Sequence, residues 1–197
     1  MKKKIIIVLT ILFVVISGGI YMYNKLTKPN FGPKTTKLYQ RGFRFLEEQI
    51  GTYIKEHYKG IEKIEFSPIY VTGDDGSSML NAYVRPTIYD KYGHKATLGV
   101  PVKKFIPLSY GLSSDIILDF DGSGDEVIEL MDSEDRLVDV SKVKHLPNEA
   151  KLTKARSTDE NISLLVQDGQ LKDVVKDEKG SPEAQIIYNV KLSKEED

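Results

Sequence analysis

The stretch Thr36-KLYQRGFRFLEEQIGTYIKEHY-Lys59 decides the fold of this chain. Its apolar residues recur at spacings of three and four, which is the period of an amphipathic helix with a buried stripe. Thr35 or Thr36 can cap the start of this helix, and Gly60 can end it in the left-handed conformation. Gly42 and Gly51 cost helix propensity but permit a sheet to pack closely. The expected stripe consists of Tyr39, Phe43, Leu46, Ile50, Tyr53, Ile54 and His57.

After this helix the sequence changes to the alternation that is typical of half-buried strands. Pro68 within 61–71 predicts an edge strand, a bulge or two short strands. Short connections between the strands from residue 80 to residue 140 predict antiparallel neighbours. The capping-box pattern Ser157-Thr158-Asp159-Glu160 predicts a short helix over 157–166. The segments 171–175 and 184–192 are expected to form a last pair of strands.

This order of elements predicts an α+β fold, with one long amphipathic helix packed on an antiparallel meander sheet. The order is similar to that of cystatin-like folds. That similarity concerns the fold alone and carries no function.

Upstream of the long helix lies an almost wholly apolar run, Ile5–Tyr23, directly behind three lysines. As a helix it would reach about 28 Å, which is close to the thickness of a bilayer core. The lysines favour a cytoplasmic N-terminus, so the chain is expected to pass once through the cell membrane with its C-terminal domain outside the cytoplasm. The alternative is a cleaved signal peptide with small residues at Ser17-Gly18-Gly19. The expected division is 1–28 for lysines and transmembrane helix, 29–37 for a tether, 38–193 for the domain and 194–197 for a frayed tail.

Composition restricts the classes of function. The chain has no cysteine, which excludes a disulfide framework, a lipid-linked cysteine and a thiol nucleophile. Residues 29–114 carry 12 basic and 8 acidic side chains, and residues 115–197 carry 11 basic and 21 acidic ones. No basic block supports nucleic acid as a partner. The acidic half favours cations, a basic partner or simply solubility.

The most specific local pattern is the loop that contains Asp119, Asp121, Ser123 and Asp125. Oxygen ligands at alternate positions with glycines between them suit Ca²⁺, so these four residues are the candidate metal ligands. The pattern resembles the start of an EF-hand loop, but Leu130 stands where that family needs a bidentate glutamate. A plain hairpin turn is the alternative interpretation.

No pattern of reactive residues indicates catalysis. The three histidines, His57, His94 and His145, are far apart in the sequence, and no nucleophile elbow, phosphate loop or zinc motif is present. Carboxylates are numerous, but their spacing does not single out an acid pair. A catalytic site is therefore not predicted.

Several segments resemble a family of small membrane-anchored proteins of unknown function from Gram-positive cocci. The resemblance rests on the anchor ending, the Lys28-Pro-Asn-Phe-Gly32 tether, the Tyr58–Glu62 junction and the turn at Leu118–Gly124. It implies a cell-envelope location and no activity. The chain is therefore predicted to be a membrane-anchored extracytoplasmic binding or interaction domain with a possible protein partner at the cell surface. The alternatives are a weak Ca²⁺-binding module and a cell-envelope hydrolase.

Overall fold

The computed structural model describes residues 27–76, 78–100, 108–112 and 114–194, together with 12, 13, 16, 17, 19, 22 and 25. Most of the expected anchor Ile5–Tyr23 and the tail 195–197 lie outside the described residues. Leu12, Phe13, Ile16, Ser17, Gly19 and Met22 are described, and all six are helical. Among the described residues, no helix has the length and apolar character needed to span a bilayer.

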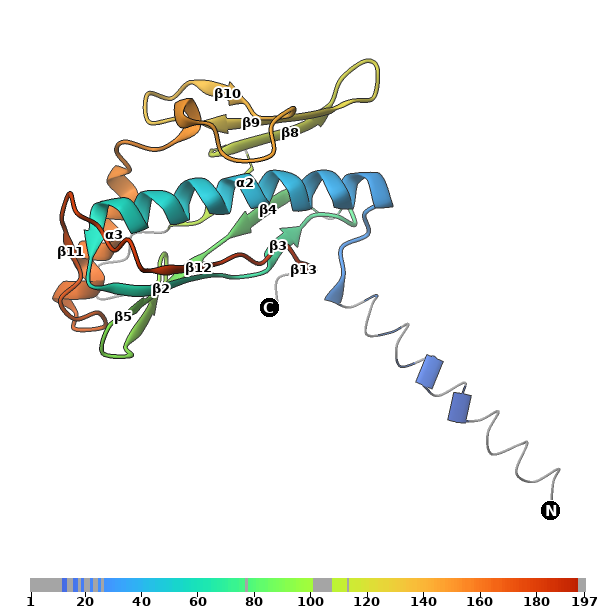
Figure 1. Ribbon diagram of the computed structural model, residues 1–197. Coiled ribbons are helices and arrows are strands. Elements are labelled where there is room, and N and C mark those ends of the chain that lie inside the picture. Colours follow the sequence, from blue (N-terminus) through green and yellow to red (C-terminus); the bar gives the residue numbers. More distant parts are fainter. Residues whose placement is uncertain are drawn as a thin grey trace.

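The domain is α+β, as predicted, and its longest element is α2, Pro33–His57 (Figure 1). In the described residues after α2, the helix is α3 Arg156–Gln167 and the short helical turn is η1 Asn148–Ala150. The strands are β1 Tyr58–Lys59, β2 Ile61–Phe66, β3 Ile69–Thr72, β4 Asn81–Val84, β5 Pro86–Asp90, β6 Lys95–Thr97, β7 Tyr110–Gly111, β8 Ile116–Phe120, β9 Glu126–Met131, β10 Leu137–Asp139, β11 Val175–Lys176, β12 Gln185–Ile187 and β13 Leu192–Lys194.

α2 begins earlier than predicted, and the residues that form its N-cap and first turn differ from the predicted ones. Gly32 occupies the N-cap position without a side-chain cap, and Pro33 stands in the first turn. Proline suits that position because its fixed φ is helical and its missing N–H would have no partner there. The predicted cap at Thr35 or Thr36 is therefore wrong. Residues 33–37, which were expected to belong to the tether, are part of the helix. Gly60 does adopt a positive φ of 86°, but it follows the two-residue strand β1 rather than the helix end.

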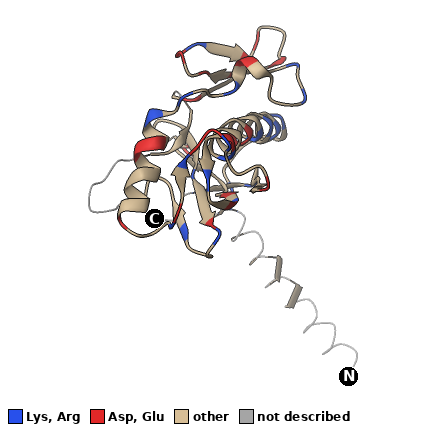
Figure 2. Cartoon of the chain, turned by 60° about the vertical axis from the view of Figure 1, so that its left-hand side comes forward, with Lys and Arg blue, Asp and Glu red and all other residues tan. Residues whose placement is uncertain are grey.

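α2 lies between two layers of sheet (Figures 1 and 2). The first layer is the antiparallel sheet β10-β9-β8, and the second contains the sheets β12-β2-β5-β6 and β13-β3-β4-β7. These two sheets form one interrupted ribbon, because the N–H of Ser67 donates to the Arg85 carbonyl at 3.0 Å where β2 passes into β3. Pro68 therefore separates two short strands, which was one of the predicted outcomes.

Two glycines let α2 pack against both layers. A Cβ at Gly42 would overlap the side chain of Leu118 in β8, and a Cβ at Gly51 would lie 3.0 Å from Ile186 Cγ2 in β12. The two positions are nine residues apart, so they lie on opposite sides of a helix with about 3.6 residues per turn. The prediction of one buried stripe on one sheet was thus incomplete, because α2 buries residues on two opposite faces.

The C-terminal segment differs from the predicted meander. β11 pairs with β1, whereas β12 and β13 pair in parallel with β2 and β3. The expected pairing of 171–175 with 184–192 is therefore wrong. Parallel pairing requires a long crossover, and the chain between β3 and β13 supplies it by way of α3. α3 begins at Arg156 with Ala155 as its N-cap residue and no side-chain cap, so the predicted capping box does not form.

Candidate functional site

The face of α2 that neither layer covers forms the floor and one wall of a groove. Lys37, Arg41, Arg44 and Glu48 follow one another at spacings of four, three and four, so they share one side of the helix. The loop Ser141–His145 forms the second wall. We call this hollow the α2 groove; its volume is about 890 Å³. It is lined by Lys37, Gln40, Arg41, Arg44, Phe45, Glu48, Ser141, Lys142, Val143, Lys144, His145 and Val190.

Arg41 fixes the shape of the groove. Its Nη1 donates to Glu126 Oε2 at 2.8 Å, and its Nη2 donates to the carbonyl oxygens of Ser141 and Val143. The guanidinium thereby joins α2 to β9 and to the loop that forms the second wall. Because Glu126 pairs with it, Arg41 contributes more to the position of the wall than to the net charge of the groove.

Arg44 is presented to the groove by an aromatic ring. Its Cζ lies 3.3 Å from the ring centroid of Tyr188, and its Nη1 lies 3.3 Å from Glu48 Oε2. Stacking on the ring restricts the rotamers of the guanidinium and leaves its edge available for hydrogen bonds. Burial raises the pKa of Tyr188, and the positive charge of Arg44 opposes that shift.

The remaining cations of the groove have no close acidic partner. Lys37, Lys142 and Lys144 are exposed, and within the described part of the chain none of them forms an ion pair. The charge of Lys142 does help to lower the pKa of Asp139, after the larger effect of hydrogen bonds from Ser141. Between the charges, Phe45 is buried and Val143 and Val190 are partly buried, so the groove combines a basic rim with an apolar floor.

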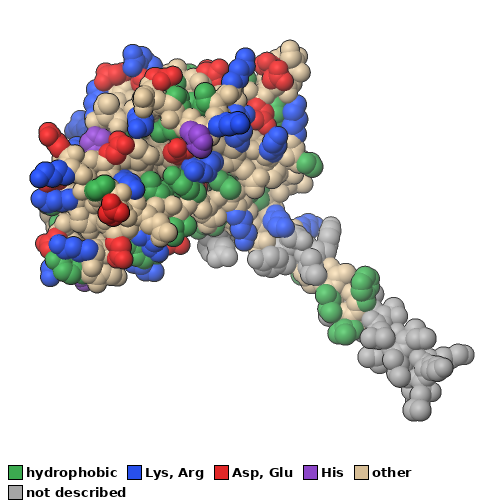
Figure 3. Space-filling view, viewed as in Figure 1, with side chains coloured by type: hydrophobic (Ala, Val, Ile, Leu, Met, Phe, Trp, Pro, Cys, Tyr) green, Lys and Arg blue, Asp and Glu red, His purple; other side chains and the backbone are tan. Residues whose placement is uncertain are grey.

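A second hollow of about 710 Å³ continues the groove towards the N-terminal segment. The two share Gln40 and Val190, and the second adds Lys28 and Lys191. Figure 3 shows blue side chains, with a histidine beside them, over α2 and again where the N-terminal segment joins the domain. The charged residues that line the two hollows are Lys28, Lys37, Arg41, Arg44, Lys142, Lys144 and Lys191 against the single acid Glu48.

Glu47 lies beneath the groove and is wholly buried. Its Oε2 accepts a hydrogen bond from the N–H of Asn189 at 2.9 Å, and its Oε1 has no hydrogen-bond partner among the described residues. Burial raises the pKa of Glu47 to about 8, although the Asn189 amide and the charge of Arg44 act in the opposite direction. The side chain is therefore mainly protonated at neutral pH and cancels little of the charge of Arg44.

Of the predicted metal ligands, Asp119 lies in β8, and Asp121, Ser123 and Asp125 lie in the exposed turn between β8 and β9. Asp121 Oδ1 accepts hydrogen bonds from the N–H groups of Ser123 and Asp125, each at 2.8 Å, and Asp119 Oδ1 accepts one from the N–H of Phe120. Lys34 Nζ donates to the carbonyl oxygen of Gly124 in the same turn. In the described part of the chain, no group of three or more acidic or histidine side chains is arranged to hold a metal ion.

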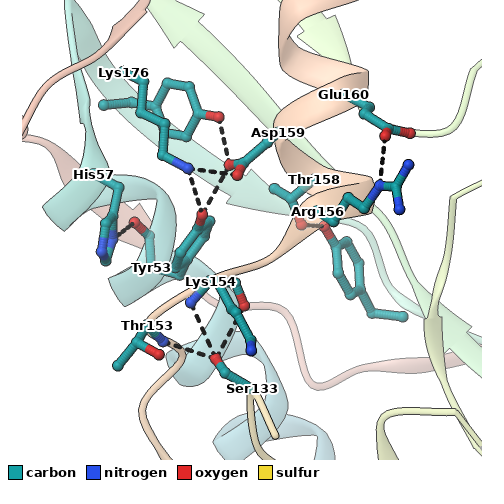
Figure 4. A network of polar contacts seen from close by, with 12 residues as sticks. Tyr53, His57, Ser133, Thr153, Lys154, Arg156, Thr158, Asp159, Glu160 and Lys176 are labelled. Carbon is teal, nitrogen blue, oxygen red and sulfur yellow. Dashed lines mark hydrogen bonds and ion pairs between the residues drawn. The ribbon is translucent and has the colours of Figure 1, made fainter. Parts of the chain in front are cut away.

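A second polar cluster fastens α3 to the end of α2 (Figure 4). Asp159 accepts hydrogen bonds from Tyr53 Oη at 2.8 Å and Tyr58 Oη at 2.6 Å, and Lys176 Nζ pairs with its other oxygen. Burial opposes ionisation of Asp159, but these hydrogen bonds outweigh burial and lower its pKa. His57 stacks on Tyr53 with ring centroids 4.3 Å apart.

The cleft beside this cluster, about 660 Å³, contains Asp159 together with Asp115. Burial raises the pKa of Asp115, whose Oδ2 accepts hydrogen bonds from the hydroxyl of Ser114 and the N–H of Gly111. Both carboxylates thus have several donors from the protein itself. This arrangement is typical of side chains that hold loops and helices in place.

The three histidines are not brought together. His57 lies at the end of α2, His94 pairs with the buried Asp90 at 2.9 Å, and His145 lines the α2 groove. The groove was not predicted from the sequence. The available signal was the spacing of Lys37, Arg41 and Arg44 on one side of a helix, but the opposing Lys142 and Lys144 lie about a hundred residues away and only the fold brings them there.

The chain was compared with protein-family models, with curated proteins and with solved structures, and none of the three comparisons found a match.

Proposed function

We propose that this chain is a membrane-tethered, extracytoplasmic and non-catalytic binding domain, and that the α2 groove takes an anionic ligand. The observation that carries this proposal is the set of seven cationic side chains that line two adjoining hollows with one acid, Glu48. Of the seven, Arg44 is paired with Glu48, and Arg41 is paired with Glu126 outside the lining. Residues 28–197, which include all seven, carry 24 basic and 29 acidic side chains in total. Basic residues are thus gathered at one place on a domain that is acidic as a whole.

The chemistry of the groove favours phosphate groups over other anions. Arg44 can donate two parallel hydrogen bonds to one tetrahedral anion, and Lys37 and Lys144 add point charges on either wall. The apolar floor at Phe45, Val143 and Val190 suits a ligand that also has an apolar part. A phosphate or phosphodiester carried by an amphiphilic molecule fits both features.

The place of the domain follows from the N-terminal segment. We propose that Ile5–Tyr23 forms a single transmembrane helix and that the cystatin-like order of a helix followed by strands stands outside the cytoplasm. The resemblance to membrane-anchored proteins of Gram-positive cocci supports an envelope location. The two carboxylates of the α3 cleft, Asp115 and Asp159, already accept hydrogen bonds from other groups of the protein. This structural role supports a function in binding without catalysis.

The test uses the full chain in nanodiscs of zwitterionic lipid, titrated with a short inorganic polyphosphate. We expect saturable binding that weakens steeply with salt, because the contacts are between exposed charges. The double variant Lys37→Glu, Lys144→Glu should lower the affinity about tenfold or more, which corresponds to about 1.4 kcal/mol. The double variant Lys95→Glu, Lys179→Glu is the matched control, because it changes the net charge by the same amount and neither exposed lysine lines either hollow.

Two results would contradict the proposal. One is the absence of saturable binding by the unaltered chain at low salt. The other is an equal loss of affinity in the control Lys95→Glu, Lys179→Glu and in the groove variant, because this would show a response to net charge rather than to the groove. A short-chain phosphatidylglycerol below its micelle concentration, tested in parallel, shows whether an apolar part adds affinity to the phosphate.

A further inference from the structure

At the end of the domain next to the N-terminal segment, the carboxylate of Asp74 connects several segments of the chain. The side chain of Asp74 is only 5% exposed and lies 3.4 Å from Lys194 Nζ. Its Oδ2 also accepts a hydrogen bond from the N–H of Asn30 at 2.7 Å. Asp74 therefore fixes the turn after β3 and the strand β13 beside the residues that lead to the N-terminal segment (Figure 1).

Two apolar side chains are exposed at the same end. Met79 is 89% exposed and Leu80 is 41% exposed. Gly73 adopts a φ of 74°, and a Cβ at this position would overlap the carbonyl oxygen of Met79, so the backbone of Met79 packs against the end of β3. The two apolar side chains are thus held beside Asp74 and Asn30, although no described part of the domain covers them.

Lysines accompany these apolar residues. Lys28 and Lys191 are exposed and line the hollow nearest to the N-terminal segment. Lys28 follows Tyr23 by five residues, which is about 8 Å along a helix. If Ile5–Tyr23 spans the hydrocarbon core, Lys28 stands at the level of the lipid headgroups. Apolar residues flanked by lysines at that level are the combination that binds an interface between water and lipid.

We propose that this end of the domain contacts the outer surface of its own membrane, with Met79 and Leu80 in the interfacial layer and Lys28 and Lys191 on anionic headgroups. We call it the anchor-proximal end, defined by Lys28, Asn30, Met79, Leu80 and Lys191. The contact rests on the anchor of the proposed function; it shares Lys28 and Lys191 with the second hollow, but none of its residues lines the α2 groove itself. It would hold the domain in one orientation, with the groove opening beside the headgroup layer.

The absence of cysteine allows a direct test, because one introduced cysteine gives one labelled position. Met79→Cys in the full chain is labelled with an environment-sensitive fluorophore and placed in nanodiscs that contain headgroup-proximal doxyl lipid. Val175→Cys is the matched control, because Val175 is also exposed and pairs with β1 at the opposite end of α2. A helix of 25 residues is about 37 Å long, which keeps the control label away from the bilayer.

We expect the label at position 79 to be quenched at least twofold more strongly than the label at position 175. Quenching at position 79 should increase when phosphatidylglycerol replaces part of the phosphatidylcholine, and the variant Lys28→Glu, Lys191→Glu should remove that increase. Equal and weak quenching at both positions in discs that contain the chain would overturn the contact and leave the anchor intact. A chain that does not stay with the discs would overturn both.

Discussion

The surroundings of Glu47 are unfavourable for a negative charge. It is wholly buried, one of its oxygens has no partner among the described residues, and burial raises its pKa to about 8. In the unfolded chain a glutamate titrates near its ordinary value of about 4.3. Between these two values the folded state binds a proton that the unfolded state has released. The stability of the domain should therefore fall as pH rises from about 5 to about 8 and then level off.

Glu47→Gln should remove this dependence. The amide keeps an oxygen for the N–H of Asn189 but cannot ionise, so its stability relative to the unaltered chain should grow by about 1.4 kcal/mol per pH unit from pH 5 to 8. Urea unfolding of the full chain in neutral detergent at several pH values measures this difference. Glu48→Gln is the control, because it removes a carboxylate of the same helix that reaches solvent. A slope shared by both variants would show that Glu47 is not responsible.

Asp121 allows the Ca²⁺ alternative to be tested at a single residue. Its carboxylate already accepts hydrogen bonds from two N–H groups of its own turn, and Lys34 donates to a carbonyl oxygen of that turn. We expect no thermal shift with millimolar Ca²⁺ and a loss of about 1–2 kcal/mol of stability in Asp121→Ala, because the turn amides lose their acceptor. A Ca²⁺-dependent shift in the unaltered chain that is absent from Asp121→Ala would establish the cation site instead.

At the scale of elements, the sequence predicted the type of structure better than its arrangement. The period of the apolar residues identified the long helix, and Pro68 marked the break between β2 and β3. Periodicity alone could not show that α2 is covered on two faces, because Gly42 carries no side chain that would signal the second contact. It also could not show that β12 and β13 pair in parallel with β2 and β3, since such pairing depends on distant partners.

The two glycines of α2 predict different tolerance to a methyl group. Alanine gains about 1 kcal/mol over glycine in helix propensity at either position. At Gly51 the nearest atoms, at 3.0 and 3.2 Å, belong to the side chain of Ile186, so a small shift accommodates Cβ. At Gly42 the new Cβ overlaps Leu118 and also approaches Ile116, and overpacking of this kind costs about 1–3 kcal/mol.

We therefore expect Gly42→Ala to be less stable than Gly51→Ala by about 1–2 kcal/mol in denaturant unfolding of the full chain. The two variants are controls for each other, because they make the same chemical change in the same helix. The opposite order of stability would mean that the layer β8-β9-β10 is packed more loosely on α2 than the second layer. In that case the wall of the α2 groove that Arg41 holds in place could also shift its position.

For the whole molecule, the proposed function depends on a domain that stands outside the cytoplasm. The candidate site could be identified only from the folded structure, because α2 contributes Lys37 and a loop distant in the sequence contributes Lys144. The proposed position of that site next to a lipid surface depends on the segment Ile5–Tyr23. Three lysines before this segment favour a cytoplasmic N-terminus, and the polar domain after it would then be carried outside.

A reporter at the C-terminus tests this topology. A fused alkaline phosphatase, which is active only outside the cytoplasm, should be active, and external protease should remove the domain from intact cells. Replacing Lys2, Lys3 and Lys4 by glutamate should reduce both signals, because the charge bias that sets the orientation is lost. The intact mass of the chain extracted from membranes separates a retained anchor from cleavage near Ser17-Gly18-Gly19. An inactive reporter together with protection from protease would place the domain inside the cell, where neither the groove nor the anchor-proximal end could meet the outer surface of the membrane.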